Sequence, residues 1–465
     1  MSSNLLTDEA QNENATTLAA ALGLSHADAA QALDISILLT ADPADSVALQ
    51  VTSHIETLLK RTVHYISSSA GTHGNCTVEV IVGSALPKTS GSKLYVKIRE
   101  DLALISQEAL SEESCVSIHP ILLLLTACYV SAATLHCALG NKSVFQVPEP
   151  LFVRFDQLGI DLNALGQSIN IEHTYLAGAG AIGNGFLWAA RHLDLTGRLE
   201  IVDDDCVSSG NLNRQVWFDT DDLELFKADR LAAKAQPFFT RLVLVPRIHR
   251  LQDLAERSNG PWLQRLVVAV DSRRSRRALQ NEFPREVFDA STTDIREIVL
   301  HYHLQPTELA CLSCIYEPDE EEFSREQHIA DHLGISVDEV RTERISEPVA
   351  QSIAAKFPEI AANMLVGTAY DTLFKKLCAE GLLRTQIDRT IVAPFAFVSV
   401  LAGTLLAIEL VRRLGNGVAD REFNYWRVSP WQPLFGRRRV LRPRQQGCPF
   451  CSNSILQKVN TTLWD

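Results

Sequence analysis

The chain has 465 residues, a length typical of about three domains or of two with large insertions. Hydrophobic residues make up 46% of the chain and charged residues 21%, and this balance excludes wholesale disorder and fibrous repeats. The 43 Lys and Arg residues against 56 Asp and Glu residues leave a net charge of −13, which would repel a phosphate backbone. We therefore expect no nucleic-acid partner.

Residues 1–17 are polar and acidic, and they contain neither the basic start nor the apolar stretch of a signal peptide, which predicts a cytoplasmic protein. Two later segments, 121–139 and 393–410, are apolar and approach the roughly 20 residues that a membrane-spanning helix needs. Both contain polar side chains, His136 and Glu409 among them. We interpret them as buried helices and expect no membrane partner.

The first 165 residues predict a separate α+β domain, with helical stretches and one clear strand at 77–82. A proline-rich join at 147–150 leads towards a second domain, which we place at 166–315 and 391–465. Short apolar strands alternate there with helices. The expected strands are 173–177, 198–203, 242–245 and 266–270, and the expected helices are 183–193, 228–239 and 395–413. Because such alternation implies parallel pairing, the predicted fold class is α/β, with a doubly wound Rossmann-like sheet.

A glycine-rich turn, Gly178-Ala-Gly180-Ala-Ile-Gly183, follows the first of these strands and opens a helix. Glycines let a phosphate approach the backbone closely, and a helix N-terminus presents unpaired N–H groups and partial positive charge. The next strand ends at Asp203, with Asp205 two residues later, where a carboxylate can accept hydrogen bonds from ribose hydroxyls. This pattern predicts a nucleotide site, and up to this point it equally fits a nicotinamide dehydrogenase.

The residues that follow separate these alternatives. The chain continues with Asn211-Leu-Asn-Arg214-Gln, Lys227 opens the next expected helix, and Asp271 ends a later strand. Together with two Cys-x-x-Cys hooks described below, this pattern resembles the ThiF/MoeB and ubiquitin-activating enzyme superfamily. The resemblance covers roughly residues 170–315 and 390–451.

The resemblance implies ATP-dependent adenylation of a carboxylate with the help of Mg²⁺. Arg214 and Lys227 would supply positive charge for attack at the α-phosphate, because negative charge builds on the phosphate oxygens in the transition state. We expect Asp271 to hold Mg²⁺, Asp203 to bind the ribose and Asn211 to hold the phosphate loop. The predicted nucleotide-binding residues are Gly178, Gly180, Gly183, Asp203, Asp205, Asn211 and Asp271.

Two positions depart from the family's pattern. Gly210 stands where serine usually precedes the asparagine, and Ser272 stands where asparagine usually follows the aspartate. An arginine that reaches in from a partner half is also common in the family, and Arg154 is the nearest candidate in this sequence. These departures affect the expected geometry of the site, but they remove no phosphate or metal ligand.

Four cysteines form the two hooks, Cys311-Leu-Ser-Cys314 and Cys448-Pro-Phe-Cys451. Thiolates are ligands that zinc favours in closed four-coordinate sites, and each hook supplies half of such a site. The alternative is two redox pairs, but neither hook stands at the start of a helix after a first strand. The sequence therefore predicts one structural Zn²⁺.

Residues 316–390 interrupt the alternation, and we interpret them as an insertion. The ubiquitin-activating branch places its catalytic-cysteine domain and crossover loop in this interval, and Cys378 is the one cysteine between the hooks. A thiolate at Cys378 can attack an acyl-adenylate and form a thioester, with Lys375, Lys376 or Arg384 near in sequence to lower its pKa. The competing interpretation of Cys378 is a small buried hydrophobe on an amphipathic helix.

In the N-terminal domain, the strand at 77–82 and the apolar helix at 121–139 resemble pieces of an adenylation domain, but no glycine turn, Arg/Lys pair or hook accompanies them. The domain therefore resembles a degenerate, inactive adenylation half. Ubiquitin-activating enzymes pair an active half with an inactive one, so the second half is expected in cis or from a homodimer.

The leading hypothesis is an enzyme that adenylates the C-terminal carboxylate of a ubiquitin-like protein. It would then capture that protein as a thioester on Cys378 for transfer to a conjugating enzyme. The alternative is an adenylyltransferase for a sulfur-carrier protein in thiamine or molybdopterin synthesis, which forms no thioester. Arg214 and Lys227 disfavour both a nicotinamide dehydrogenase and a non-enzymatic partner subunit.

Overall fold

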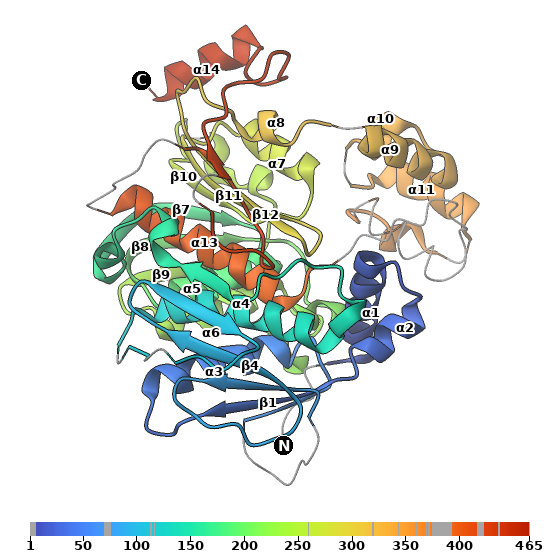
Figure 1. The fold of residues 1–465 in the computed structure, drawn as a ribbon. Helices are drawn as coiled ribbons and strands as arrows, with labels where there is room; N and C mark the ends of the chain where they lie inside the picture. Colours follow the sequence, from blue (N-terminus) through green and yellow to red (C-terminus); the bar gives the residue numbers. More distant parts are fainter. Residues whose placement is uncertain are drawn as a thin grey trace. The chain divides into compact units, whose positions relative to one another are not determined.

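The computed structural model describes residues 6–464 with the exception of 69–75, 112–113, 116, 259, 319, 343, 359, 369, 371–372, 374–392, 416–422 and 436–437. The chain divides into two compact units (Figure 1). Unit 1 comprises Met1–Ile315 and Val392–Asp465, and unit 2 comprises Tyr316–Ile391. The N-terminal region and the residues that carry the glycine turn thus lie in the same unit.

The larger sheet of unit 1 has eight strands in the order β14-β13-β12-β11-β10-β7-β8-β9. Its strands are β7 (Ser168–Ala177), β8 (Asp194–Val202), β9 (Leu242–Arg247), β10 (Arg265–Val268), β11 (Glu286–Thr293), β12 (Glu297–Leu304), β13 (Tyr425–Val428) and β14 (Arg439–Val440). Strands β7 to β11 pair in parallel, whereas β12 to β14 extend the sheet in antiparallel fashion. The parallel part runs outward from β7 in both directions, so the predicted doubly wound α/β fold is confirmed.

This strand order creates a switch point between β7 and β10, where a doubly wound sheet binds its ligands. Ala177 at the end of β7 pairs with Val202 of β8 on one side and with Val268 of β10 on the other. The three strands therefore end at the same level. The segments that follow them begin along one edge of the sheet, and the Gly178 N–H donates to the Val202 carbonyl at 3.0 Å.

The N-terminal region forms a second sheet of six strands in the order β2-β1-β3-β4-β5-β6. Its strands are β1 (Ser36–Ala41), β2 (Tyr65–Ser67), β3 (Val78–Val82), β4 (Ser92–Ile98), β5 (Leu102–Ser106) and β6 (Leu151–Arg154). The first four are parallel, and β5 and β6 are antiparallel. The sequence predicted β3 alone, because short apolar runs such as β1 and β5 cannot be told from buried helix by periodicity.

The helices of unit 1 cover these sheets and join them. They are α1 (Asp8–Leu22), α2 (His26–Ala32), α3 (Ser46–Leu59), α4 (Pro120–Leu139), α5 (Ala181–Ala190), α6 (Lys227–Ala235), α7 (Arg273–Gln280), α8 (Leu312–Ile315), α13 (Ala396–Leu414) and α14 (Ser454–Trp464). Helices α3 and α4 pack on the six-stranded sheet, α13 packs on the eight-stranded sheet, and α4 packs against α13 (Figure 1). One continuous hydrophobic core therefore runs through both sheets of unit 1.

The helical segment Pro120–Lys142 is long and apolar enough to cross a membrane by length and composition alone. In unit 1, 83% of the most apolar 18-residue stretch of this segment is buried. The apolar helix α13 is likewise buried along nearly its whole length. The prediction that both apolar segments are buried helices is confirmed.

Unit 2 has a hydrophobic core of its own. Its described α-helices include α9 (Glu320–Leu333), α10 (Val337–Val340) and α11 (Glu347–Lys356). Ile329, Leu333, Ile353 and Tyr370 are buried in this core. The described part of unit 2 is thus a small helical body that buries its apolar faces internally.

Helices α5 and α13 touch through their backbones. A Cβ atom on Gly403 would lie 2.2 Å from the carbonyl carbon of Gly185, and one on Gly185 would lie 2.6 Å from the Ser399 carbonyl oxygen. Both distances are far below van der Waals contact, so neither position can hold a side chain without separating the helices. Since α5 begins at the glycine turn, this contact fixes the helix that the turn opens.

Gly403→Ala should lower the free energy of unfolding by about 1–3 kcal/mol, because the added methyl group overpacks a backbone contact. Gly166→Ala is the matched control, since a Cβ atom there would meet nothing within 4 Å. Thermal unfolding of both variants checks the prediction. Equal melting temperatures for the two variants would contradict the close contact between α5 and α13.

Candidate functional site

The glycine turn has one open position between two crowded ones. Gly178 has a φ of +100°, and a Cβ atom there would lie 2.8 Å from the backbone of Ala269. A Cβ atom on Gly183 would lie 2.1 Å from the Gly178 carbonyl oxygen, whereas Gly180 has nothing within 4 Å. The first and third glycines are therefore needed to build the turn. Gly180 faces open space directly before α5.

Asp203 links the glycine turn to the acidic turn after β8, because one carboxylate oxygen bonds to each. Its Oδ2 accepts the Ala179 N–H at 2.7 Å, and its Oδ1 accepts the Asp205 N–H at 2.9 Å. Burial raises the pKa of Asp203 to about 6, although the positive charge of Lys227 opposes this shift. Asp203 is thus ionised above about pH 6 and holds the turn at the end of β8.

Lys227 is the first residue of α6, and its side chain points back to the acidic turn. Its Nζ donates to Asp205 Oδ2 at 3.0 Å, and the residue is only 9% exposed. Burial lowers the pKa of Lys227, but the carboxylates of Asp203, Asp205 and Asp271 outweigh burial and leave it above its ordinary value. Lys227 therefore remains a cation among three carboxylates.

Arg214 follows the 3-10 helix η4 (Ser209–Asn213). Its Nη1 donates to the Gly210 carbonyl at 3.2 Å and to Asn213 Oδ1 at 2.7 Å. Burial lowers the pKa of Arg214, while the charges of Glu13 and Asp271 oppose that shift. Asn211 closes the same turn, because its Oδ1 accepts the Ser208 N–H at 3.2 Å.

Asp271 is an exposed residue that comes shortly after β10, at the edge where β7 and β8 also end. The preceding carbonyl, that of Val270, accepts a hydrogen bond from Arg276, whose buried guanidinium also pairs with Asp289. Ser272 is the N-cap of α7, and its Oγ accepts the Ser275 N–H at 2.9 Å. The serine that replaces the family's usual asparagine at position 272 therefore caps helix α7.

The structure brings most of the predicted site residues together. Asp271 interacts electrostatically with both Arg214 and Lys227, and Lys227 contacts the acidic turn that holds Gly178–Gly183. These residues come from the ends of three parallel strands, from the segment between β8 and α6, and from the first residue of α6. Their arrangement combines an open glycine turn, two cations and several carboxylates, which are the groups that a nucleotide triphosphate and a divalent cation require.

Asn184 is a site residue that the sequence analysis missed. It is fully buried in the first turn of α5, and its Nδ2 donates to the Ala179 carbonyl at 2.8 Å. Its Oδ1 accepts the Trp217 N–H at 3.0 Å. Asn184 thus links the glycine turn to the segment that follows Arg214. The signal available in the sequence was a polar residue one position after Gly183 in an otherwise apolar helix.

The four hook cysteines converge in unit 1. All four sulfur atoms lie within 4.8 Å of one another, and four of the six sulfur–sulfur distances are 3.4–3.8 Å. Cys311, Cys314 and Cys448 are buried. Four sulfurs placed 2.3 Å from a zinc ion at the corners of a tetrahedron would be about 3.8 Å apart. The cluster is therefore compatible with a structural zinc ion in both ligand type and spacing.

Two further residues, Cys378 and Arg154, were predicted from the sequence. Cys378 lies outside the described residues, so its predicted role stays a prediction. Arg154, the candidate for an arginine from a partner half, ends β6 and pairs with Asp156 at 2.6 Å on the exposed surface.

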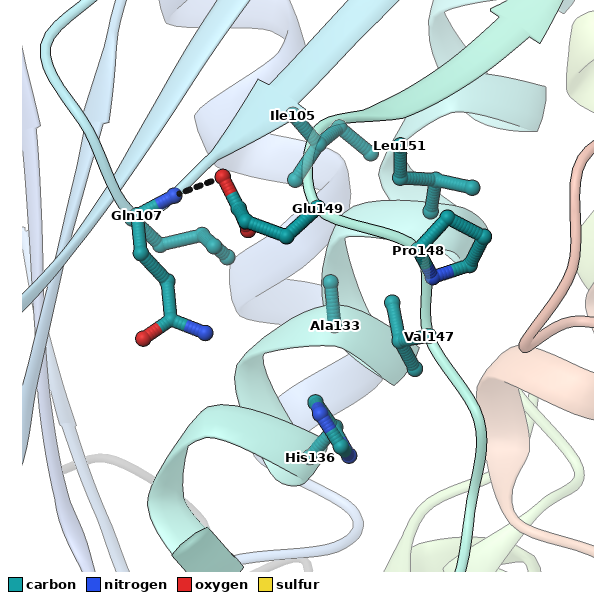
Figure 2. Close-up of a pocket in the computed structure, with 9 residues that line it drawn as sticks. Ile105, Gln107, Ala133, His136, Val147, Pro148, Glu149 and Leu151 are labelled. Atoms are coloured by element: carbon teal, nitrogen blue, oxygen red, sulfur yellow. Dashed lines mark hydrogen bonds between the residues drawn. The ribbon is translucent and has the colours of Figure 1, made fainter.

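A small pocket lies apart from these groups, in the N-terminal region. Glu149 enters it and accepts a hydrogen bond from the Gln107 N–H at 2.9 Å (Figure 2). It also accepts one from the Ser106 hydroxyl. The lining residues are Leu94, Ile105, Gln107, Ala133, His136, Val147, Pro148, Glu149 and Leu151. None of these lining residues was predicted to be a site residue. The carboxylate of Glu149 already has a backbone partner and a hydroxyl partner.

The doubly wound sheet, the glycine turn with its charged cluster and the four-cysteine cluster define a ThiF/E1-like adenylyltransferase fold. Residues 158–450 match the ThiF family, and the chain belongs to this family. Residues 7–161 match the E1 N-terminal domain. The resemblance to the ThiF and ubiquitin-activating superfamily is thus confirmed.

The chain is also similar to uncharacterized protein y4jF of Sinorhizobium fredii (strain NBRC 101917 / NGR234), with 30% identity over 270 residues. That match covers 54% of this chain and 51% of the relative, so the chain spans about half the length of the curated relative it matches. Three crystal structures of E. coli MccB are similar at 14–16% identity with TM-scores of 0.35–0.37. The matches cover 70% of this chain and 74–75% of those chains. All three structures include MccA, in one case as MccA-N7isoASN and in another together with AMPCPP.

We expect purified protein to contain one zinc ion per chain, because four thiolates at tetrahedral spacing form a closed zinc site. Metal analysis should show that Cys448→Ser loses the metal and unfolds at a lower temperature. Cys206→Ser is the control, since Cys206 is exposed and lies outside the cluster. Iron in place of zinc, or four freely reactive thiols without metal, would contradict the assignment.

Proposed function

We propose that this protein is an ATP-dependent activating enzyme that adenylates the C-terminal carboxylate of a ubiquitin-like protein. The convergence of Arg214, Lys227 and Asp271 beside the open glycine turn carries this proposal. Membership of the ThiF family supports the adenylation chemistry. The E1 N-terminal domain at residues 7–161 favours a ubiquitin-like protein over a sulfur carrier as the substrate.

In the proposed reaction, a carboxylate oxygen of the substrate protein attacks the α-phosphorus of ATP. A carboxylate O–P bond forms, the bond from the α-phosphorus to the bridging oxygen breaks, and pyrophosphate leaves with the electron pair. Negative charge increases on the phosphate oxygens during this step. Arg214 and Lys227 are assigned to stabilise that charge, and both are held in place by hydrogen bonds before any ligand arrives.

The remaining predicted residues are assigned to bind ATP. The open space at Gly180 and the N-terminus of α5 suit the approach of a phosphate group. Asp203, ionised above about pH 6, is assigned to the ribose hydroxyls while it braces the turn. Asp271 offers an exposed carboxylate for Mg²⁺, which supplies charge neutralisation on the phosphates when bound.

Arg214→Ala and Lys227→Ala should each reduce carrier-dependent exchange of pyrophosphate into ATP by a factor that corresponds to about 2.7–4 kcal/mol. This is the cost of losing one preorganised donor to a developing oxyanion. Asp271→Ala should remove the Mg²⁺ dependence together with activity. The assay is run at pH 8, where Asp203 is ionised.

Arg99→Ala and Lys60→Ala are matched charge controls, because both side chains are exposed and form surface ion pairs with Asp101 and Glu56. Exchange in these controls should equal that of the unaltered protein. Full exchange in Arg214→Ala or in Lys227→Ala would show that the phosphate site is misassigned.

The second part of the proposal is that Cys378 receives the activated protein as a thioester. Its thiolate would attack the carbonyl carbon of the acyl-adenylate, so that a C–S bond forms and AMP leaves with the electrons of the broken C–O bond. A thiolate is nucleophilic near neutral pH and keeps the carboxyl group activated. The position of Cys378 in the inserted segment and outside the zinc ligands supports this role.

Incubation of the protein with its carrier and MgATP should give an adduct on non-reducing gels that a reductant removes. Cys378→Ala should lose the adduct and keep pyrophosphate exchange, because adenylation precedes capture. Cys206→Ala is the control and should keep both. An adduct that survives Cys378→Ala would assign the thioester to another thiol, and no adduct at all would favour a sulfur-carrier adenylyltransferase.

The proposed thioester needs an acceptor, and a conjugating enzyme with its own cysteine fits that requirement.

We further propose a homodimer, because activating enzymes of this superfamily pair two adenylation-type halves. The six-stranded N-terminal sheet supports a second, inactive half in cis as the other arrangement. Sedimentation of the purified protein distinguishes the two arrangements.

A further inference from the structure

The N-terminal helix α1 lies directly on the turn that precedes Arg214. The Thr7 hydroxyl at the start of α1 donates to the Ser209 carbonyl at 3.1 Å. A Cβ atom on Gly210 would lie 3.4 Å from Cγ of Glu13. Helix α1, in the region that matches the E1 N-terminal domain, therefore contacts η4, the turn before Arg214 in the ThiF-family region of the same chain.

A chain of hydrogen bonds connects this helix to the Arg214 side chain. Arg214 Nη1 donates to Asn213 Oδ1 at 2.7 Å, and Asn213 Nδ2 donates to Asn14 Oδ1 at 3.0 Å. Asn14 Nδ2 in turn donates to the Arg61 carbonyl at 2.8 Å. Asn14 and Asn213 are at most 1% exposed, so water cannot replace these bonds. Each amide is therefore held in one orientation.

The side chain of Arg61 holds the same segment from the other side. Its guanidinium donates to the carbonyl oxygens of Leu212, Val216 and Phe218 at 2.5, 3.1 and 2.8 Å. The residue is 3% exposed. Burial lowers the pKa of Arg61 to about 10, against the opposing charges of Asp219 and Asp222, so Arg61 is charged at neutral pH.

These contacts fix the backbone on both sides of Arg214. The Arg214 Nη1 donates to the amide oxygen of Asn213 at 2.7 Å, a shorter bond than the 3.2 Å one to the Gly210 carbonyl. If the Asn14 side chain were removed, the buried Asn213 Nδ2 would lose its hydrogen-bond acceptor. The Asn213 amide would then be less firmly held with its Oδ1 towards Arg214. Phosphate stabilisation depends on preorganised donors, so the orientation of Asn213 matters to any anion that Arg214 binds.

We propose that Asn14 and Arg61 are positioning residues for the phosphate-binding Arg214, so that the N-terminal region completes the adenylation site within the same chain. The network Arg214–Asn213–Asn14 and the three carbonyl contacts of Arg61 carry this inference. It rests on the proposed adenylation function, because that function assigns Arg214 to phosphate.

The test compares Asn14→Ala with Thr17→Val in the full-length protein. Asn14→Ala removes two buried hydrogen bonds of α1, those with Asn213 and with the Arg61 carbonyl, whereas Thr17→Val removes one, in which the Thr17 hydroxyl donates to the Ala393 carbonyl. Binding of MgATP and of MgAMPCPP is measured by calorimetry. We expect the dissociation constant to rise about tenfold in Asn14→Ala, the effect of one buried hydrogen bond, and to be unchanged in Thr17→Val.

Asn213→Ala and the double variant Asn14→Ala/Asn213→Ala test whether Asn14 acts through Asn213. The double variant should bind MgATP no more weakly than Asn213→Ala alone, since the link is already broken. Additive losses in the double variant, or equal losses in Asn14→Ala and Thr17→Val, would overturn the proposal and leave α1 with a general effect on stability.

Amide hydrogen exchange of residues 211–218 gives a readout that needs no ligand. Exchange there should be faster in Asn14→Ala than in Thr17→Val, because the segment loses its anchor to α1. If the unaltered protein binds no MgATP, the proposed adenylation fails. The exchange rates then still decide whether the N-terminal region orders the Arg214 segment, and equal rates in the two variants would contradict that.

Discussion

The candidate site depends on one constraint: the parallel strands β7, β8 and β10 end in register at the same edge of the sheet. Ala177, Val202 and Val268 are register neighbours, so the segments that leave β7, β8 and β10 start from one edge. Gly178 and Asp203 are therefore adjacent in space although 25 positions apart in numbering, and Asp203 braces the turn directly. A shift of one residue in either pairing would turn the side chains to opposite faces and separate these groups.

The site is also tied to the rest of unit 1 by buried polar contacts. Asn184 joins the glycine turn to the segment after Arg214, and Asn14 joins that segment to α1. The backbone contact between Gly185 and Gly403 fixes α5 against α13, which in turn packs on α4 of the N-terminal region. The N-terminal region is therefore part of the same packed body as the eight-stranded sheet.

Charge balance explains how two cations can be held in place at the site. Lys227 lies among Asp203, Asp205 and Asp271, and Arg214 lies near Glu13 and Asp271. Each cation has carboxylates nearby that offset part of its desolvation, which reduces the cost of burying it. An incoming triphosphate would compete with these carboxylates, and a divalent cation beside Asp271 would relieve the resulting repulsion between like charges.

The sequence by itself determined the α/β class, the doubly wound sheet, both apolar helices and the pairing of the two cysteine hooks in one cluster. Apolar periodicity, glycine spacing and paired cysteines are local signals, so they can be read along the chain. Five strands of the six-stranded sheet, the antiparallel extension β12 to β14 and the roles of Asn14, Asn184 and Arg61 came only from the tertiary structure. Several of these depend on distant partners, such as Asn213, which lies 199 positions from Asn14. No pattern of residues near Asn14 or Arg61 shows that a buried amide or guanidinium is needed there.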